Sequence, residues 1–272
     1  MITKRIIDEK GIDQTEDTVL VLGYFDGLHK GHQALFEKAR EIATEQGLKI
    51  AVLTFPESPK LAFVRYQPEL MLHLASPEDR MAQLESLGVD YLYLIDFTSH
   101  FAGNTARDFF EKYVSRLRAK AVVAGFDYHF GSDRKESHEL RDYFNGKIVI
   151  VPSVNLDNRK ISSTRIRETI AVGDMLKTQE LLGYPLSTRG IVVHGNARGR
   201  TIGYPTANLA PLDRVRLPGD GVYVADVEHN GQRYRGMASV GKNVTFDGDE
   251  LRFEVNIFDF SQDIYGDTIR IF

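Results

Sequence analysis

Short apolar runs alternate with longer segments of helical periodicity through the first 185 residues of the chain. Runs of four or five apolar residues predict buried strands, and they lie at 18–22, 50–53, 91–95, 121–124 and 148–151. Between the runs, apolar residues recur every three or four positions, which predicts amphipathic helices. Strands separated by helices favour an α/β, Rossmann-like domain, with a parallel sheet and helices on both faces.

The pattern changes near residue 185. Two helical segments, 163–171 and 175–182, end at Gly183-Tyr184-Pro185. Short alternating runs separated by Gly, Asn, Asp and Pro follow, at 190–193, 222–227, 234–239, 252–258 and 268–272. This pattern predicts a smaller antiparallel β-barrel domain. We therefore expect an α/β domain at 1–185 and a barrel domain at 186–272.

Composition narrows the class of protein. The 272 residues are 42% hydrophobic and 26% charged, which is typical of a soluble globular protein. A net charge of -4 argues against a general nucleic-acid binder, and the absence of cysteine excludes disulfides and thiolate chemistry. No long apolar stretch and no signal peptide is found, so we expect a cytoplasmic protein without membrane contact. The sequence does not indicate an oligomeric state.

The segment Gly23–His32 connects the first predicted strand to the first helix, and we call it the histidine loop. Gly27 and Gly31 allow close backbone approach to a ligand, and amides at a helix start bind anions. His29 and His32 are three residues apart, so they lie on one side of the first turn. Two imidazoles and free amides suit a triphosphate that gains charge at its α-phosphorus during attack. The candidate phosphate-binding residues are Gly23, Phe25, Asp26, Gly27 and Gly31.

Alone, a His-x-x-His pair is more often a pair of polar loop residues, and it has too few ligands for structural zinc. A second segment strengthens the phosphate interpretation. Ser163 and Thr164 stand at a predicted helix start with Arg165 and Arg167, which together suit phosphate oxygens. Ordinary N-capping by a serine is the alternative, but we expect both segments to bind one ATP.

The two segments resemble the GxHxGH and ISSTRIR motifs of HIGH-type nucleotidylyltransferases, in particular the adenylyltransferase module of bifunctional bacterial riboflavin kinase/FAD synthetases. The segments 53–56, 122–131 and 181–183 support the resemblance. It implies that His29 and His32 bind ATP phosphates and that Asp127 lies beside the nucleotide. It also implies a clamp formed by Ser163, Thr164 and Arg165. Pro56-Glu57-Ser58-Pro59 departs from the family's Pro-x-Pro with an intervening histidine, so we expect a changed flavin or metal side of the pocket.

The predicted barrel carries a glycine-rich and arginine-rich segment at 195–208. Such a loop can wrap a diphosphate through backbone amides. Thr206 and Asn208 are two apart, so in an extended segment they face the same way. Their hydroxyl and amide oxygens suit Mg²⁺ held partly by phosphates. A bare loop of glycine and arginine would more simply be a surface hairpin, but the full fourteen-residue segment favours a phosphate-binding loop. The candidate ATP-binding residues are Gly195, Arg198, Gly199, Gly203 and Pro205.

This segment resembles the signature of flavokinases, and 263–266 also matches that family. The resemblance implies that Glu254 is the catalytic base, which takes the proton from the ribityl hydroxyl as it attacks the γ-phosphate. Asn256 stands where the family often has histidine. The chain ends at Phe272 within a strand-like run, whereas family members continue, so we expect a shortened kinase domain.

The expected protein is a bifunctional transferase of FAD biosynthesis. It phosphorylates riboflavin to FMN with Mg²⁺ and ATP, then transfers AMP from ATP to FMN to give FAD and pyrophosphate. The expected catalytic residues are His29, His32, Arg165 and Glu254, and the expected partners are small molecules only. Two alternatives remain at this stage. One is an adenylyltransferase of the same fold for phosphopantetheine or nicotinate mononucleotide, and the other is a flavin- or nucleotide-binding regulator with an inactive kinase module.

Overall fold

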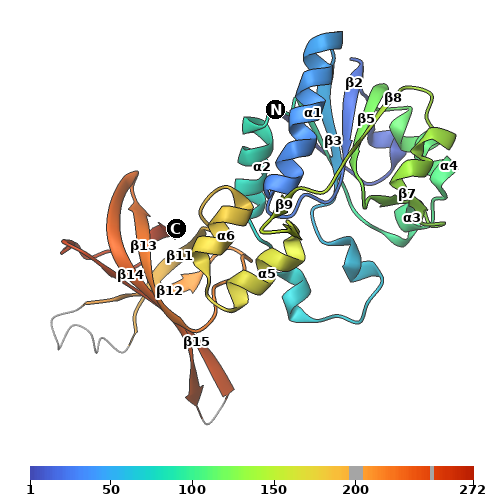
Figure 1. The fold of residues 1–272 in the computed structure, drawn as a ribbon. Coiled ribbons are helices and arrows are strands. Elements are labelled where there is room, and N and C mark those ends of the chain that lie inside the picture. Colours follow the sequence, from blue (N-terminus) through green and yellow to red (C-terminus); the bar gives the residue numbers. More distant parts are fainter. Residues whose placement is uncertain (196–204, 246–247) are drawn as a thin grey trace. The chain divides into compact units, whose positions relative to one another are not determined.

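The computed structural model describes residues 1–195, 205–245 and 248–272. The chain forms two compact units (Figure 1). The first unit comprises Met1–Met71 and Pro77–Ser162, and the second comprises Leu72–Ser76 and Ser163–Phe272. Each unit is described by itself, and the functional domains expected at 1–185 and 186–272 stay a prediction.

The first unit is built on a six-stranded parallel sheet with the order β1-β4-β3-β2-β5-β8. The bounds are Ile2–Ile6 (β1), Thr18–Leu22 (β2), Lys49–Thr54 (β3), Tyr91–Ile95 (β4), Ala119–Gly125 (β5) and Lys147–Val151 (β8). The five predicted strands are confirmed. Strand β1 at the edge is an addition, since only its two end residues are apolar.

Helices cover both faces of this sheet, as predicted (Figure 1). On one face α1 (Lys30–Gln46) and α2 (Pro77–Ser86) pack on Val19 and Val21. On the other face α3 (Ser99–Ala102), α4 (Ala106–Phe109) and a π-helical turn (Phe110–Val114) pack on Leu20 and Leu22. Because alternate residues of β2 point to opposite faces, the whole strand is buried. The helix predicted around 109–117 is observed as the short α-helix α4 continued by the π-helical turn.

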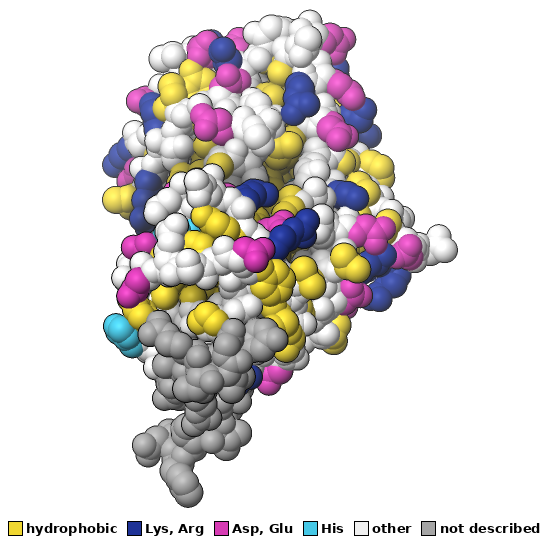
Figure 2. Space-filling view, turned by 90° about the vertical axis from the view of Figure 1, so that its left-hand side faces the viewer, with side chains coloured by type: hydrophobic (Ala, Val, Ile, Leu, Met, Phe, Trp, Pro, Cys, Tyr) yellow, Lys and Arg dark blue, Asp and Glu magenta, His cyan; other side chains and the backbone are white. Residues whose placement is uncertain are grey.

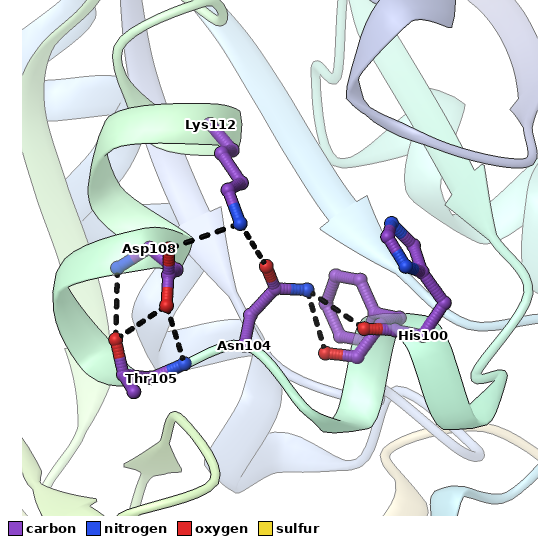
Figure 3. A network of polar contacts seen from close by, with 6 residues as sticks. His100, Asn104, Thr105, Asp108 and Lys112 are labelled. Carbon is purple, nitrogen blue, oxygen red and sulfur yellow. Dashed lines mark hydrogen bonds and ion pairs between the residues drawn. The ribbon is translucent and has the colours of Figure 1, made fainter.

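A polar network joins α3 to α4 (Figure 3). The amide nitrogen of buried Asn104 donates to the carbonyls of His100 (3.0 Å) and Phe101 (2.9 Å). Lys112 donates to Asn104 Oδ1 at 3.0 Å and pairs with Asp108 at 2.9 Å. The Asn104 side chain thus adds hydrogen bonds to carbonyls in the last turn of the short helix α3, which stabilises two elements too short to be stable alone.

Short elements complete the first unit. Its 3₁₀ helices are Glu9–Gly11 (η1), Pro59–Ala62 (η2), Pro68–Met71 (η3) and Ser137–Asp142 (η5). Its two small hairpins are formed by β6 (His129–Phe130) with β7 (Lys135–Glu136) and by β9 (Asn155–Leu156) with β10 (Arg159–Lys160). The second hairpin lies between β8 and the predicted serine-arginine helix.

The second unit contains α5 (Ser163–Ala171), α6 (Met175–Leu182) and a closed antiparallel barrel with the order β11-β12-β15-β14-β13-β16. The bounds are Thr188–Val193 (β11), Ala207–Pro211 (β12), Gly221–His229 (β13), Gln232–Thr245 (β14), Gly248–Ile257 (β15) and Thr268–Ile271 (β16). Apolar side chains including Val227, Val255 and Ile269 fill the interior. The predicted barrel is confirmed, with β12 as an additional strand.

Charge is distributed rather than concentrated on the face drawn in Figure 2, where acidic and basic side chains of described residues are interspersed. Among the helices of the described ranges, none is long and apolar enough to cross a membrane.

Candidate active sites

The histidine loop leaves the carboxyl end of the central strand β2 and leads into α1. Its backbone reverses sharply, with positive φ at Phe25 (57°), Gly27 (74°) and Leu28 (36°). Positive φ is costly for the two side-chain-bearing residues, but each is only 1% exposed, so burial holds the conformation. Gly23 is required as well, because a Cβ there would lie 2.6 Å from the Phe25 ring. The loop therefore has one well-defined shape.

The two predicted histidines contact each other. Buried His29 is the N-cap of α1, and its Nδ1 accepts the backbone N–H of His32 at 3.3 Å. The imidazoles stack with centroids 3.7 Å apart and planes 14° apart. Phe25 meets the His32 ring edge-on at 5.3 Å. At Gly31 a Cβ would press on the His29 ring at 3.1 Å, so glycine preserves the stack.

His32 is held in its neutral form. Burial lowers its pKa well below the usual value, and the charges of His29, Arg80 and Lys160 lower the pKa further. Its Nδ1 is buried and has no hydrogen-bond partner among the described residues. The positive charges around this partly buried imidazole favour an anion as its neighbour. This is the electrostatic environment that a bound polyphosphate would need.

Two cations of this site were not predicted from the sequence. Arg80, only 7% exposed, comes from α2, and Lys160 comes from β10. Lys160 pairs with Asp127, and its Nζ lies 4.5 Å from the centroid of the Phe126 ring. Asp127 follows β5, which neighbours β2 in the sheet. The structure thus places Asp127 at the carboxyl ends of the strands, on the side of the sheet from which the histidine loop leaves and where α/β sheets bind ligands.

The remaining predicted residues of the first site begin α5 in the second unit. Arg165 is 7% exposed, whereas Thr164 is exposed. Ser163 and Arg167 are partly buried. The two predicted halves of the ATP site thus belong to different compact units, and their meeting around one ATP stays a prediction.

The barrel gathers a second set of polar side chains. Thr206 Oγ1 donates to Glu254 Oε2 at 3.3 Å, and Asn208 lies opposite Glu254 in the ladder between β12 and β15. Residues opposite each other in a ladder share a face of the sheet. Asn256 Nδ2 donates to the carbonyl of Pro205 at 2.7 Å. The predicted Thr206, Asn208 and Glu254 are therefore neighbours.

Gly195 borders the same place, because a Cβ there would lie 2.3 Å from the Asn208 side chain. Arg198, Gly199 and Gly203 lie outside the described residues. In the parts of the chain that are described, no three His, Asp or Glu residues form a metal-binding group. The hydroxyl of Thr206, the amide oxygen of Asn208 and the Glu254 carboxylate are nevertheless hard oxygen donors that fit Mg²⁺ with phosphate and water as further ligands.

Residues 263–266, which match the flavokinase family, contact the end of β11, the strand that leads to Gly195. Tyr265 stacks on His194 with centroids 3.8 Å apart, and Gly266 N donates to Val192 O at 2.9 Å. Buried His229 contacts Asp267 Oδ2 through its Nε2 at 2.8 Å. Neither histidine was singled out from the sequence, since each gains its partner only when distant strands meet.

Comparisons with known proteins cover both units. A family model described as FAD synthetase matches residues 11–165, and one described as riboflavin kinase matches residues 182–272. Proteins named bifunctional riboflavin kinase/FMN adenylyltransferase are similar along the chain. The one from Listeria monocytogenes is 40% identical over 93% of this chain and 82% of its own length. The one from Bacillus subtilis is 37% identical over 95% of this chain and 84% of its own length.

A solved structure from Streptococcus pneumoniae, titled as a macrolide-efflux protein, is also similar. It is 57% identical with a TM-score of 0.97, over 100% of this chain and 90% of that one. Two family models in succession and relatives matched over most of their length show the family. The chain belongs to the bifunctional riboflavin kinase/FMN adenylyltransferase family.

Proposed function

We propose that this chain makes FAD from riboflavin in two ATP-dependent steps. The barrel transfers the γ-phosphoryl group of ATP to riboflavin, and the α/β part transfers AMP from a second ATP to the resulting FMN, releasing pyrophosphate. One observation carries the proposal: a single chain matches both family models in succession, with the histidine loop inside the first match and Glu254 inside the second.

Adenylyl transfer needs alignment and charge neutralisation. The FMN phosphate is already a nucleophile, so no strong base is required. His29, His32 and the amides at the start of α1 bind the triphosphate and stabilise the charge that grows at the α-phosphorus. Lys160 adds a cation near this site. Arg165, with Ser163 and Thr164, supplies donors from the start of α5, and Asp127 lies beside the nucleotide.

Aromatic rings at the carboxyl ends of β3 and β4 suit the flavin. Phe55 meets Phe97 at 4.9 Å and Phe101 at 5.4 Å between centroids. Phe63 contacts Phe97 at 5.6 Å and is 69% exposed. A planar isoalloxazine can extend such an edge-to-face cluster. Because Pro56–Pro59 lies between Phe55 and Phe63, its departure from the family pattern falls on the flavin side.

Phosphorylation needs a base. Glu254 takes the proton of the ribityl hydroxyl that attacks the γ-phosphate. Thr206 and Asn208 would hold Mg²⁺, which when bound neutralises phosphate charge. Asn256 fixes the carbonyl of Pro205, and so positions the backbone next to Thr206.

A crossover experiment tests both assignments at once. The protein is incubated with ATP, Mg²⁺ and either riboflavin or FMN, and the flavins are separated by chromatography. The double variant His29→Asn/His32→Asn should lose FAD formation from FMN yet still make FMN from riboflavin. Glu254→Gln should lose FMN formation from riboflavin yet still make FAD from FMN. The activity that each variant retains shows that its loss of the other activity does not come from global unfolding. Binding without turnover by the wild type, or pyrophosphate release with phosphopantetheine but not FMN, would refute the proposal.

A further inference from the structure

Arg80 occupies a position that local physics disfavours. It stands in the first turn of α2, where the helix dipole repels cations, and its side chain is buried at 7% exposure. Burial lowers the pKa of the guanidinium, while Tyr24, Asp26 and Glu57 oppose that shift. A buried cation at the wrong end of a helix needs compensating contacts.

The contacts of Arg80 all lie at the carboxyl ends of two neighbouring strands. One terminal nitrogen donates to the carbonyl of Phe55 at 2.8 Å. The other donates to the carbonyl of Tyr24 and, at 2.6 Å, to the hydroxyl of Thr54. Thr54 in turn donates to the same Tyr24 carbonyl at 2.9 Å. The planar guanidinium therefore connects the end of β3 to the second residue of the histidine loop.

We propose that Arg80 is a positioning residue for adenylyl transfer, which holds the backbone of the histidine loop against the end of β3. This inference rests on the proposed function of the loop. Tyr24 also stacks beneath Arg80, with the guanidinium carbon 5.1 Å from the ring centroid. Phe25, which has a positive φ, follows Tyr24 immediately in the loop, so a displaced Tyr24 would move both imidazoles. Arg80 has a second effect at a distance, since its charge helps to lower the pKa of His32.

Two substitutions separate geometry from charge. Arg80→Lys keeps the cation but cannot bridge Tyr24, Thr54 and Phe55 with a planar fork. Arg80→Met removes both the fork and the charge. Because small misplacements of catalytic groups cost up to about 10²-fold in rate, we expect Arg80→Lys to lower kcat for FAD formation from FMN by roughly 10- to 10²-fold, with KM for FMN changed less. Thr54→Val should give a smaller decrease in kcat.

An independent measurement is the pKa of the His32 imidazole, obtained from a pH titration monitored by NMR. Removing a nearby cation raises the pKa of an imidazole. Arg80→Met should therefore raise the pKa of His32, whereas Arg80→Lys should leave it close to wild type. A role in stability alone would lower the melting temperature without this charge-dependent difference.

Arg40→Lys is the matched control, because Arg40 also donates to a backbone carbonyl, that of Leu87, at 2.9 Å. It should leave kcat unchanged. The inference is wrong if kcat of Arg80→Lys falls no further than that of Arg40→Lys, or if Arg80→Met leaves the His32 titration unaltered. If Arg80→Met does not fold, Arg80→Lys and Thr54→Val decide by kcat alone. A wild type that makes no FAD from FMN would instead refute the proposed function.

Discussion

His29 has one observed role and one proposed role, which a single pair of substitutions can separate. We propose that its imidazole binds the triphosphate, and its Nδ1 caps α1 by accepting the His32 N–H at 3.3 Å. Asparagine is a good N-cap residue but has no imidazole, whereas alanine provides neither group. The comparison of His29→Asn with His29→Ala therefore distinguishes capping from catalysis.

The magnitudes follow from these contacts. Loss of a side-chain cap costs about 1 kcal/mol, which lowers the melting temperature of a unit of this size by roughly 2–4 °C. We expect His29→Ala to show this decrease and His29→Asn to remain within about 1 °C of wild type. Removal of one donor that stabilises transition-state charge costs about 10²–10³ in kcat, and both variants should show that loss.

The assays are thermal unfolding and the rate of FAD formation from FMN and ATP. Riboflavin phosphorylation by the same samples is the control for integrity of the barrel. Full activity in His29→Asn, together with low activity in His29→Ala, would show that the residue acts only as a helix cap. The assignment of His29 to ATP would then be wrong.

Three further perturbations test the packing and electrostatics of each unit. The folded state lowers the pKa of His32, so protons bind preferentially to the unfolded chain, and the urea midpoint of unfolding should fall as pH drops below about 6.5. His32→Asn should flatten this dependence of the midpoint on pH, and an unchanged dependence would contradict the neutral imidazole. Asn104→Ala should cost roughly 1–3 kcal/mol in chemical denaturation, and Lys112→Met should cost less because Lys112 is 41% exposed; equal costs would contradict the network of Figure 3. The Asp213 side chain is 6% exposed, and its carboxylate accepts hydrogen bonds from the Arg189 guanidinium at 2.9 Å and 3.1 Å. Burial raises its pKa, but these bonds outweigh that effect and the net pKa is lowered. Asp213→Asn should therefore cost about 1.5–3 kcal/mol at pH 7, and the deficit should shrink as pH falls below about 4; a deficit independent of pH would contradict the ion pair.

The sequence predicted the sheet because its central strands are buried on both faces and thus consist of continuous apolar runs. Strand β1 escaped prediction because Thr3, Lys4 and Arg5 break its apolar pattern, as an edge strand permits. Strand β12 was expected only as an extended segment, since Ala207–Pro211 has one buried residue, Leu209. Burial on both faces revealed the central strands of the sheet as continuous apolar runs, whereas the barrel strands were recognised by alternation of apolar and polar residues.

The histidine loop was predictable for a different reason. Its glycines, histidines and helix start are adjacent in the chain, so local spacing carries the signal. Arg80 is 56 residues from Tyr24, and Lys160 is 33 residues from Asp127, so no local pattern reveals either pair. One signal was available for Arg80, which lies four residues before buried Leu84 and therefore on the buried face of α2.

The two candidate sites differ in the manner that their reactions require. An attacking phosphate brings its own negative charge, and the site around the histidine loop places the cations Arg80 and Lys160 near the neutral His32, with Asp127 paired to Lys160. An attacking hydroxyl must lose a proton, and the barrel offers the Glu254 carboxylate beside Thr206. The carboxylates near the first site lie by cations, since Asp127 pairs with Lys160, and the charges of Asp26 and Glu57 oppose the lowering of the pKa of Arg80 by burial. A carboxylate facing the FMN phosphate without such a partner would repel the nucleophile, whereas the kinase reaction needs a carboxylate that can accept the hydroxyl proton. The distribution of charge therefore supports the proposal that adenylyl transfer takes place at the histidine loop and phosphoryl transfer beside Glu254.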